Sequence, residues 1–221
     1  MSDTIQRHLD DATLASYASG TLPRPLRIVA ATHLELCRHC RRNLRLAEEV
    51  ATSLAMESEG EMTFAPALKS AVLAQIDTAT VHRFPKPLHP RSSALPRTLA
   101  YELGIESLEQ IKWRKAGPGI EMAKLPKASD QQGFFGLLRI QPGSEVPDHG
   151  HGGTELTLVL HGAYDDEMGR FSVGDIADLD SSIAHKPVAD ASGPCICLVA
   201  NDAPTRFRSL AARLLQPFIG I

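Results

Sequence analysis

The stretch GSEVPDHGHGGTELTLVLHG, residues 143–162, decides how the second half of the chain folds. It follows the pattern G-x5-H-x-H-x3-E-x6-G, whose fixed polar positions are His149, His151 and Glu155. Side chains alternate between the two faces of a strand, so these three residues share one face if a single unbroken strand carries them. Two imidazoles and a carboxylate that face an apolar interior need a partner, and a divalent metal is the simplest one.

A fourth candidate ligand, His185, follows the turn-forming pair Gly174-Asp175 and a short strand. This arrangement resembles the cupin fold. The first cupin motif is matched at every fixed position, and Gly174 and His185 fit the second, although Ala189 stands where many cupins have Asn. The alternative is a pair of surface histidines in a glycine-rich loop, against which the apolar run LTLVL argues. The resemblance implies a barrel that holds a divalent metal, with Zn²⁺ the expected ion, on His149, His151, Glu155 and His185.

Composition limits the possible classes of protein. The chain has 221 residues, of which 43% are hydrophobic, enough for one large or two small packed domains. Its net charge of -3 lacks the basic excess of a general nucleic-acid binder. No apolar run approaches the length of a membrane span, and the polar start MSDTIQRHLDD differs from a secretory signal, so we expect a cytoplasmic protein. Four cysteines in that reducing compartment favour metal ligands or free thiols over disulfides.

Residues 1–80 have the apolar spacing of short helices. Asp11 is placed to cap a first helix, and two prolines suit the start of a second. The expected helices run from Asp11 to Ser19, onward from Pro23 and Pro25, from Arg38 to Glu57 and from Pro66 to Asp77.

The last two of these helices carry apolar stripes with two possible uses. The stripes consist of Leu44, Ala47, Val50, Ala51 and Leu54 on the third helix and of Leu68, Val72 and Ile76 on the fourth. A stripe that a small domain does not bury can dock in the groove of a partner. The alternative is that the fourth helix packs on the first three. A basic run at the start of the third helix suits either an acidic partner or a solvated face, and comprises Arg38, Arg41, Arg42 and Arg45.

The composition changes after the helices. Residues 81–96 are rich in proline and lack periodicity, as in a linker. From about residue 97, short apolar runs between turn residues predict the strands of a β-sandwich or barrel. These runs are IKWRKA, GIEMAKL, GFFGLLRIQ, TELTLVL and CICLVAN. The tail from Thr205 to Leu215 has helical spacing at Phe207, Leu210, Ala211 and Leu214, and we expect it to pack on the barrel.

The helical part contains a second candidate metal site. His33, Cys37 and Cys40 form the motif H-x3-C-x2-C, and His8 lies upstream as a fourth ligand. Residues 33 and 37 share a helix face if the second helix continues that far. Two nitrogens and two sulfurs suit tetrahedral Zn²⁺ in a closed, structural site. The alternatives are ordinary buried thiols beside a core histidine, and His39 as a rival ligand, although adjacent residues 39 and 40 would chelate poorly.

The motif H-x3-C-x2-C after an earlier histidine resembles the zinc-binding anti-sigma domain. With the linker and the cupin motifs behind it, the chain is similar to the ChrR family of cupin-containing anti-sigma factors over nearly its whole length. The resemblance implies two domains: a small all-α zinc-binding domain at residues 1–80 and an all-β cupin barrel (β-sandwich or jelly roll) at residues 97–221. The implied ligands of the first domain are His8, His33, Cys37 and Cys40.

The resemblance also implies a regulatory function. In this family the helical domain binds an extracytoplasmic-function sigma factor and blocks the surfaces by which sigma contacts core RNA polymerase. The cupin domain is needed for the release of sigma under oxidative stress, notably singlet oxygen. The expected protein is thus a transcription regulator and not an enzyme, without direct contact to nucleic acid or membrane.

Three questions stay open in the sequence. The alternative function is a metal-dependent cupin dioxygenase or isomerase with an N-terminal zinc module, because an octahedral ion on three histidines and one glutamate keeps positions free for oxygen or substrate. Cys195 and Cys197 face the same way on an expected strand, either as oxidisable thiols near the metal or as inert packing. The oligomeric state is not indicated.

Overall fold

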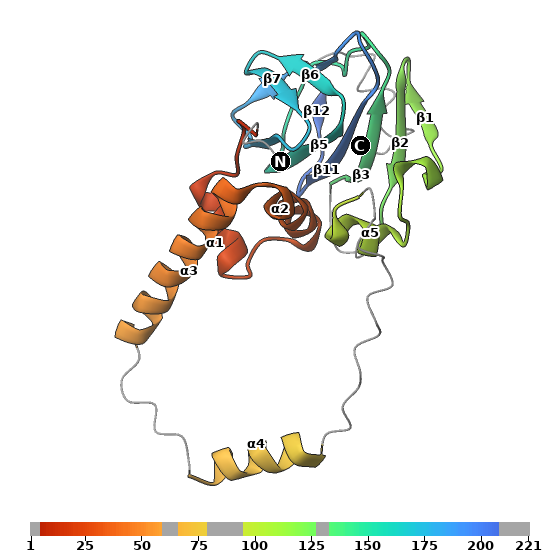
Figure 1. Ribbon diagram of the computed structural model, residues 1–221. Helices are drawn as coiled ribbons and strands as arrows, with labels where there is room; N and C mark the ends of the chain where they lie inside the picture. The colour runs from red at the N-terminus through yellow and green to blue at the C-terminus, as the bar shows by residue number, and fades with distance from the viewer. Residues whose placement is uncertain (1–4, 59–65, 79–94, 127–132, 208–221) are drawn as a thin grey trace.

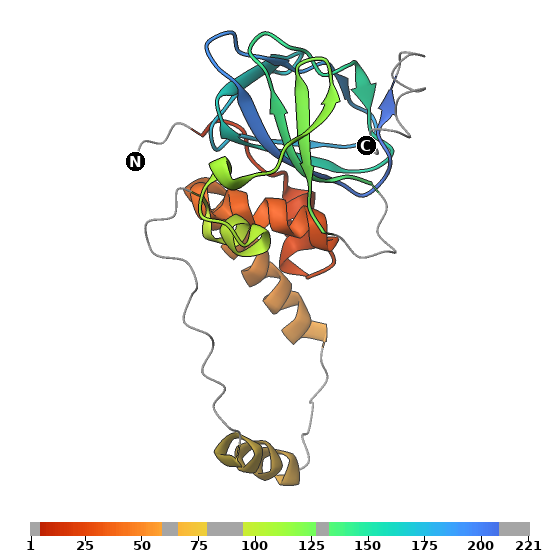
Figure 2. The ribbon, with the colours of Figure 1, turned by 90° about the vertical axis from the view of Figure 1, so that its right-hand side faces the viewer.

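Two unlike parts, one helical and one built of strands, make up the protein (Figure 1). The computed structural model describes residues 5–58, 66–78, 95–126 and 133–207. The helices come first in the chain and lie at one end of the strands in both views (Figure 1, Figure 2). The predicted fold class, a helical module followed by a cupin-type β domain, is therefore confirmed.

The first 80 residues contain four described helices, at the places that the apolar spacing predicts. They are α1 (Asp11–Ala18), α2 (Arg24–Leu36), α3 (Arg38–Ser58) and α4 (Pro66–Thr78). The N-cap of α1 is Asp10, one residue earlier than expected, and its side chain accepts a hydrogen bond from the Thr13 amide at 2.5 Å. Pro23 precedes α2 and Pro25 lies in its first turn, where backbone amides have no helical partner.

Large apolar side chains are exposed along α3 and α4. Those that the structure describes are Leu46, Val50, Leu54 and Met56 on α3, and Leu68, Val72 and Leu73 on α4. In both views α4 lies apart from the other described elements (Figure 1, Figure 2). The alternative that Leu68 and Val72 pack on the first three helices is therefore wrong, and the side chain of Ile76 lies outside the described residues.

The β part consists of one six-stranded and two three-stranded antiparallel sheets. The large sheet has the order β1-β2-β3-β11-β5-β8, and the small sheets have the orders β10-β6-β7 and β12-β4-β9. The strands are β1 Arg114–Gly117, β2 Ile120–Lys124, β3 Phe135–Ile140, β4 His149–Gly150, β5 Glu155–His161, β6 Ala163–Asp166, β7 Gly169–Ser172, β8 Ile176–Leu179, β9 Ala184–His185, β10 Val188–Ala189, β11 Cys195–Asn201 and β12 Arg206–Phe207. The five apolar runs of the sequence correspond to β1, β2, β3, β5 and β11, which confirms their prediction as strands.

A continuous apolar core joins the helices to the large sheet. Helix α2 packs against β5 and β11. The shared cluster includes Leu26 and Val29 from the helix and Leu156, Leu158 and Leu198 from the strands, each at most 1% exposed. Because β5 is covered on both faces, its sequence is a nearly unbroken apolar run rather than an alternating one.

The chain after residue 94 departs from expectation in its first elements. Residues Arg97–Leu103 form helix α5, a short 3-10 helix follows at Leu108–Gln110, and the first strand begins only at Arg114. Helix α5 packs on α2, and the Glu35 carboxylate accepts hydrogen bonds from its first amides, those of residues 97 and 98, at 2.7 Å each. This cap, together with the burial of Leu99, favours a helix where β structure was expected from residue 97.

The tail also differs from expectation where it is described. Phe207 is buried in β12, paired with β4, and does not begin a helix. The backbone pairing satisfies amides and carbonyls that the expected helix would have satisfied internally. The rest of that expected helix and most of the 81–96 linker lie outside the described residues. Among the helices that are described, none is long and apolar enough to cross a membrane.

Candidate metal sites

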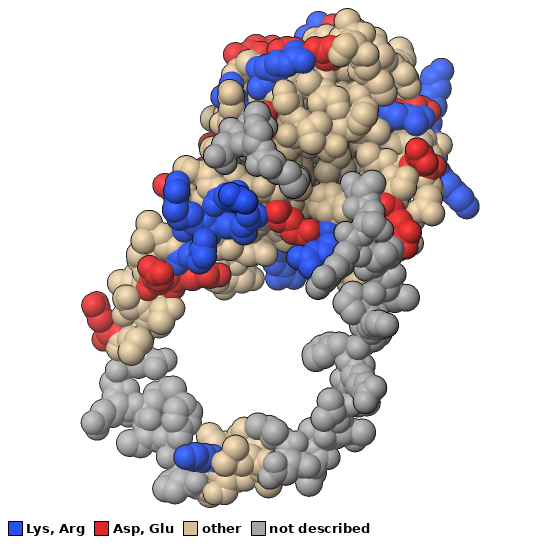
Figure 3. Space-filling model, viewed as in Figure 1, with Lys and Arg blue, Asp and Glu red and all other residues tan. Residues whose placement is uncertain are grey.

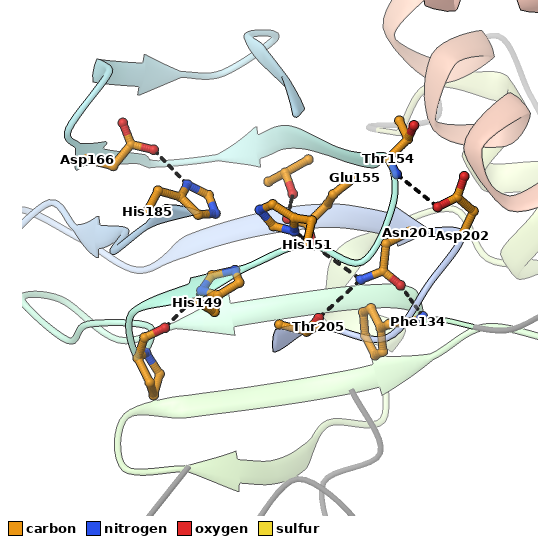
Figure 4. Close-up of polar contacts among 12 residues, drawn as sticks. Phe134, His149, His151, Thr154, Glu155, Asp166, His185, Asn201, Asp202 and Thr205 are labelled. Atoms are coloured by element: carbon orange, nitrogen blue, oxygen red, sulfur yellow. Dashed lines mark hydrogen bonds and ion pairs between the residues drawn. The ribbon is translucent and has the colours of Figure 1, made fainter. Parts of the chain in front are cut away.

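The histidines and the acid of the 143–162 stretch converge inside the barrel. His149 lies on β4, with His151 directly after it, and Glu155 begins β5. On β9, His185 pairs with His149 across the sheet. One ligand-type atom of each of the four residues lies within 4.8 Å of those of the others, and all four side chains are buried (Figure 4).

This convergence does not come from the alternation of a single strand, because the condition of one unbroken strand is not met. Strand β4 ends at Gly150, and a loop precedes β5. Gly152 and Gly153 allow the loop to pass close to the chain near residue 203, because a Cβ atom at position 152 would lie 3.0 Å from the Ala203 side chain. Glu155 therefore reaches the histidines from the large sheet, whereas His149 and His185 belong to a small one.

Hydrogen bonds orient two of the imidazoles. Asp166 Oδ2 lies 2.9 Å from His185 Nδ1, and the Pro147 carbonyl lies 2.8 Å from His149 Nδ1. In each case Nδ1–H donates and Nε2 keeps its lone pair, an arrangement typical of metal-binding histidines. His185 Nε2 and both ring nitrogens of His151 are buried without a hydrogen bond, since the 3.3 Å contact of His151 Nδ1 with Glu155 Oε2 is an ion-pair distance without hydrogen-bond alignment. A bound cation would satisfy these atoms.

Residues outside the motif hold the carboxylate of Glu155. Thr157 Oγ1 donates to its Oε1 at 3.1 Å, and Asn201 Nδ2 donates to its Oε2 at 3.2 Å (Figure 4). Asn201 is itself fixed, because its Oδ1 accepts from the Phe134 amide at 2.5 Å and its Nδ2 also reaches Thr205 Oγ1 at 3.3 Å. No motif pointed to Asn201. The available signal was a polar residue at the end of the apolar run CICLVAN.

The pKa shifts of Glu155 and His149 favour the forms of these two side chains that bind cations. Burial acts to raise the pKa of Glu155, but its contact with His151 and the nearby charges of His149 and His185 outweigh burial and lower the pKa to about 2. Burial lowers the pKa of His149. An ionised carboxylate beside imidazole nitrogens forms a donor set that suits a divalent ion such as zinc.

The two cysteines of β11 lie next to this quartet. A cavity of about 40 Å³, mostly apolar in its lining, borders His149, Glu155, His185 and Cys197. Cys195 Sγ lies 3.6 Å from Cys197 Sγ, so the two thiols share a face as predicted. The hydrogen bond with Cys195, and then burial, raise the pKa of Cys197 well above its usual range. A buried, protonated thiol reacts slowly, which favours the packing interpretation over the oxidisable one.

The second quartet lies between the helices and the barrel. It comprises His8 just before α1, His33 in the last turn of α2, Cys37 at the C-cap of α2 and Cys40 in the first turn of α3. Their ligand-type atoms lie within 4.8 Å of one another. His33 Nε2 is 3.2 Å from Cys40 Sγ, and His8 Nδ1 is 3.3 Å from Cys37 Sγ. A tetrahedral zinc ion places its nitrogen and sulfur ligands roughly 3.5 Å apart, so the donor set and its spacing fit zinc.

A turn, and not one helix face, assembles this quartet. Helix α2 ends at Leu36, and Cys37 is extended, with φ -98° and ψ 112°. Its amide donates to the His33 carbonyl at 2.9 Å, while its Sγ accepts from the Cys40 amide at 3.4 Å. The second helix therefore stops one residue short of the point at which residues 33 and 37 would share a helix face, and the turn brings the two side chains together instead.

The imidazole of His33 is oriented by the barrel. Its Nδ1–H donates to the Gly174 carbonyl at 3.0 Å, which leaves Nε2 free to face Cys40. Burial lowers the pKa of His33 to about 4 and raises that of the Cys40 thiol to about 12. A cation is the group that would hold this thiol as a thiolate. The ring of His39 stacks on His8 at 4.3 Å and lies outside the quartet, so the rival-ligand alternative is not supported.

Fold and sites together define a two-module regulator-type architecture: a small helical module with a closed quartet of two His and two Cys, docked on a cupin barrel with a quartet of its own. Residues 104–204 match the family described as the ChrR cupin-like domain. Over 218 residues the chain is 42% identical to the anti-sigma-E factor ChrR of Cereibacter sphaeroides, which covers 99% of this chain and 100% of that protein. The chain belongs to the ChrR family of anti-sigma factors.

A solved structure supports the same assignment. The crystal structure of Rhodobacter sphaeroides SigE in complex with the anti-sigma ChrR matches with a TM-score of 0.72 and 40% identity, over 90% of this chain and 100% of that chain. ChrR is a regulator and not an enzyme. The cupin dioxygenase or isomerase that the barrel alone would allow is therefore not supported.

Proposed function

We propose that this protein binds a sigma factor of the extracytoplasmic-function class in the cytoplasm and keeps it from core RNA polymerase. The relative of solved structure is seen in complex with SigE, and it resembles this chain over nine-tenths of its length. The observation on this chain that carries the proposal is the exposed stripe of α3. Leu46, Val50 and Leu54 recur every four residues and are 61%, 51% and 61% exposed.

Such a stripe has the chemistry of a docking surface. Apolar residues four apart on an uncovered helix are the anchors by which helices enter apolar grooves. Leu68, Val72 and Leu73 give α4 a second exposed apolar surface on the same module. Two uncovered apolar helices on a small module would be a liability for aggregation, and a bound partner removes it.

The charges of the helical module also support a docking surface for a partner. Basic side chains gather over the first turns of α3 (Figure 3). Arg41 is used inside the module, where its guanidinium donates to the Glu35 carbonyl at 2.9 Å and to that of Leu34 at 2.5 Å. Arg38 and Arg45 are exposed and suit an acidic partner surface beside the apolar one.

Zinc is the metal we propose for the helical quartet of His8, His33, Cys37 and Cys40. A bound Zn²⁺ would supply structural cross-linking there, with no open position for catalysis. It would tie the segment before α1 to the turn between α2 and α3 and so hold the docking helices in place. For His149, His151, Glu155 and His185 we propose a divalent metal, again with zinc preferred.

The cupin module is the proposed sensor of oxidative stress, including singlet oxygen. Release requires that the oxidised and unoxidised states bind sigma with different affinity. Two features support a connection between the modules. Strand β8 pairs with β5 so that Leu179 lies opposite Glu155, and the turn before β8 contacts His33.

The test is a binding and transcription assay with the extracytoplasmic-function sigma factors of the native host. We expect a stable complex with one of them and loss of transcription by its holoenzyme. Failure of every such sigma factor to bind would overturn the anti-sigma assignment. Exposure to singlet oxygen should weaken the complex of the full chain, whereas the His185→Ala variant should keep it. An unchanged complex after oxidation would remove the sensor function alone.

A further inference from the structure

The turn between β7 and β8 makes contacts that neither quartet accounts for. Asp175 in this turn is 4% exposed, and its carboxylate accepts three backbone hydrogen bonds. Its Oδ1 takes the amides of Gln6 and Arg7 at 2.7 and 3.1 Å, and its Oδ2 takes the Ser172 amide of its own turn at 2.8 Å. The neighbouring Gly174 supplies the carbonyl that accepts from His33.

The segment before α1 lies along this part of the barrel (Figure 1). The Ile176 amide donates to the Arg7 carbonyl at 3.4 Å. The Arg7 guanidinium donates to the Met168 carbonyl at 2.5 Å and lies over the Phe171 ring, 5.1 Å from its centroid. The next residue along this anchored segment is His8, a member of the helical quartet.

The close contact between the turn and the segment before α1 requires a glycine at position 174. Its φ of +92° belongs to the left-handed region that disfavours other residues. A Cβ atom there would lie 2.8 Å from Cδ1 of Ile5, in the same N-terminal segment. The turn and the segment before α1 therefore fit each other closely, on the residues that flank His8.

We propose that Asp175 is a positioning residue for the metal site of the helical module. Its carboxylate fixes residues 6 and 7 and so aims His8 at the quartet, while the adjoining Gly174 carbonyl fixes the tautomer of His33. Two of the four ligands, one on each side of the site, are thus placed by a single turn of the cupin barrel. The inference rests on the proposed zinc site and not on sigma binding.

The size of the effect follows from the nature of the contacts. Loss of an outer hydrogen-bond partner of a metal ligand commonly lowers metal affinity by about 10- to 100-fold. Removing the Asp175 carboxylate would leave the amides of residues 6 and 7 without their acceptor and loosen the backbone that carries His8. The cupin quartet does not contact this carboxylate, and its affinity should stay the same.

The experiment uses the full chain loaded with Co²⁺, whose thiolate charge-transfer absorption reports the helical quartet because the cupin quartet contains no sulfur. Titration with a chelator then gives the affinity of each site. We expect Asp175→Ala to lower the affinity of the thiolate site by at least about tenfold. Asp175→Asn, which retains an acceptor oxygen, should recover most of it.

Asp190→Ala is the matched control. The Asp190 carboxylate also caps its own turn, accepting from the Ser192 amide at 2.8 Å, but its partners lie within the barrel. This variant should bind cobalt at the thiolate site as the unmodified chain does. The proposal is overturned if Asp175→Ala leaves that affinity unchanged, if Asp190→Ala lowers it equally, or if Asp175→Ala weakens both metal sites to the same extent. Sigma is absent from the assay, so failure of the proposed function would leave this result standing.

Discussion

Asn201 connects the backbone amide just before β3 to the Glu155 carboxylate of β5, a candidate metal ligand. It accepts from the Phe134 amide and donates to Glu155 Oε2, so the carboxylate cannot turn away without breaking a buried network. Buried networks of this kind are costly when one member is lost. Asn201 therefore belongs to the function of the cupin site although it is not one of the four candidate ligands.

We expect Asn201→Ala to lower the metal affinity of the cupin quartet by about tenfold or more, because Glu155 loses an orienting donor. The measurement is chelator competition on the cobalt-loaded chain. Ser53→Ala, at an exposed position of α3, is the control and should change neither site. If the Asn201 variant and the unmodified chain bind the metal of the cupin quartet with equal affinity, the hydrogen bond from Asn201 is not needed to orient Glu155.

Asp178 predicts a pH dependence of stability. Burial raises its pKa from 3.8 to about 6, against the hydrogen bonds from Asp10 and Thr13. Because the folded-state pKa lies above the unfolded one, the stability that this group contributes is full below pH 3.8 and is lost as the pH rises through about 6. Relative to Asp178→Asn, the unmodified chain should lose about 1–3 kcal/mol of unfolding free energy between about pH 4 and pH 7, as measured by denaturant melts. A difference between the two proteins that does not vary with pH would contradict this origin.

At the residue scale, the sequence predicts the candidate metal ligands better than the groups that orient them through hydrogen bonds. Motif spacing identified the eight side chains that the structure brings together in two quartets. It could not identify Asp166, Asn201 or the Gly174 carbonyl, because these contacts depend on how distant strands and helices pack. Their roles as metal ligands and outer partners stay predictions until metal binding is measured.

Among the elements, α3 divides most clearly into a part that belongs to the module and a part that is exposed for a partner. Its first turns belong to the helical quartet and the module core, and its later turns are exposed on all sides in the described structure. Leu54 continues the stripe of Leu46 and Val50, whereas Met56 lies on the other side of the helix, since two residues turn an α-helix by about 200°.

We expect Leu54→Asp to weaken sigma binding by about 10-fold or more, because a charge would enter an apolar contact. Met56→Asp is the matched control on the same turn, where the side chain is 74% exposed, and it should bind nearly as the unmodified chain. Isothermal titration with the purified sigma factor gives both values. If Met56→Asp weakens binding more than Leu54→Asp, the partner lies on the opposite side of α3.

Elements with a long periodic signal were predictable, and short ones were not. The helices at residues 24–36 and 38–58 and the strands at residues 155–161 and 195–201 follow directly from apolar spacing. Helix α5 has only seven residues, and its cap is Glu35 from a distant part of the chain. Strand β4 has two residues and exists because β9 and β12 flank it. The division of the chain at residue 97 stays a prediction. Helix α5 falls in the range predicted for the barrel, yet it packs on α2 of the helical module.

Apolar packing and hydrogen bonds join the two modules of the molecule. The apolar cluster runs from Leu26 and Val29 of α2 into the large sheet. Asp175 and Asp178 accept hydrogen bonds from the segment around His8, and the Gly174 carbonyl accepts one from the imidazole of α2. A change that loosens the barrel therefore reaches the helical module through packing and through hydrogen bonds. This arrangement suits the proposed function, in which the barrel and the partner-binding helices must change state together.

A shared core predicts that the two modules unfold together. Helical circular dichroism reports the first module, and the fluorescence of Trp113, the one tryptophan of the chain, reports the start of the large sheet. In the metal-loaded protein both probes should give the same denaturant midpoint. Leu26→Ala should shift both midpoints together by a loss of about 2–5 kcal/mol, because a buried cavity forms in the common core. Leu46→Ala, at an exposed position of the same module, should change the free energy by less than about 0.5 kcal/mol. Separate midpoints, with only the helical signal displaced by Leu26→Ala, would mean that the two modules unfold independently. The barrel would then influence the helical module only through the turn at residues 174–175.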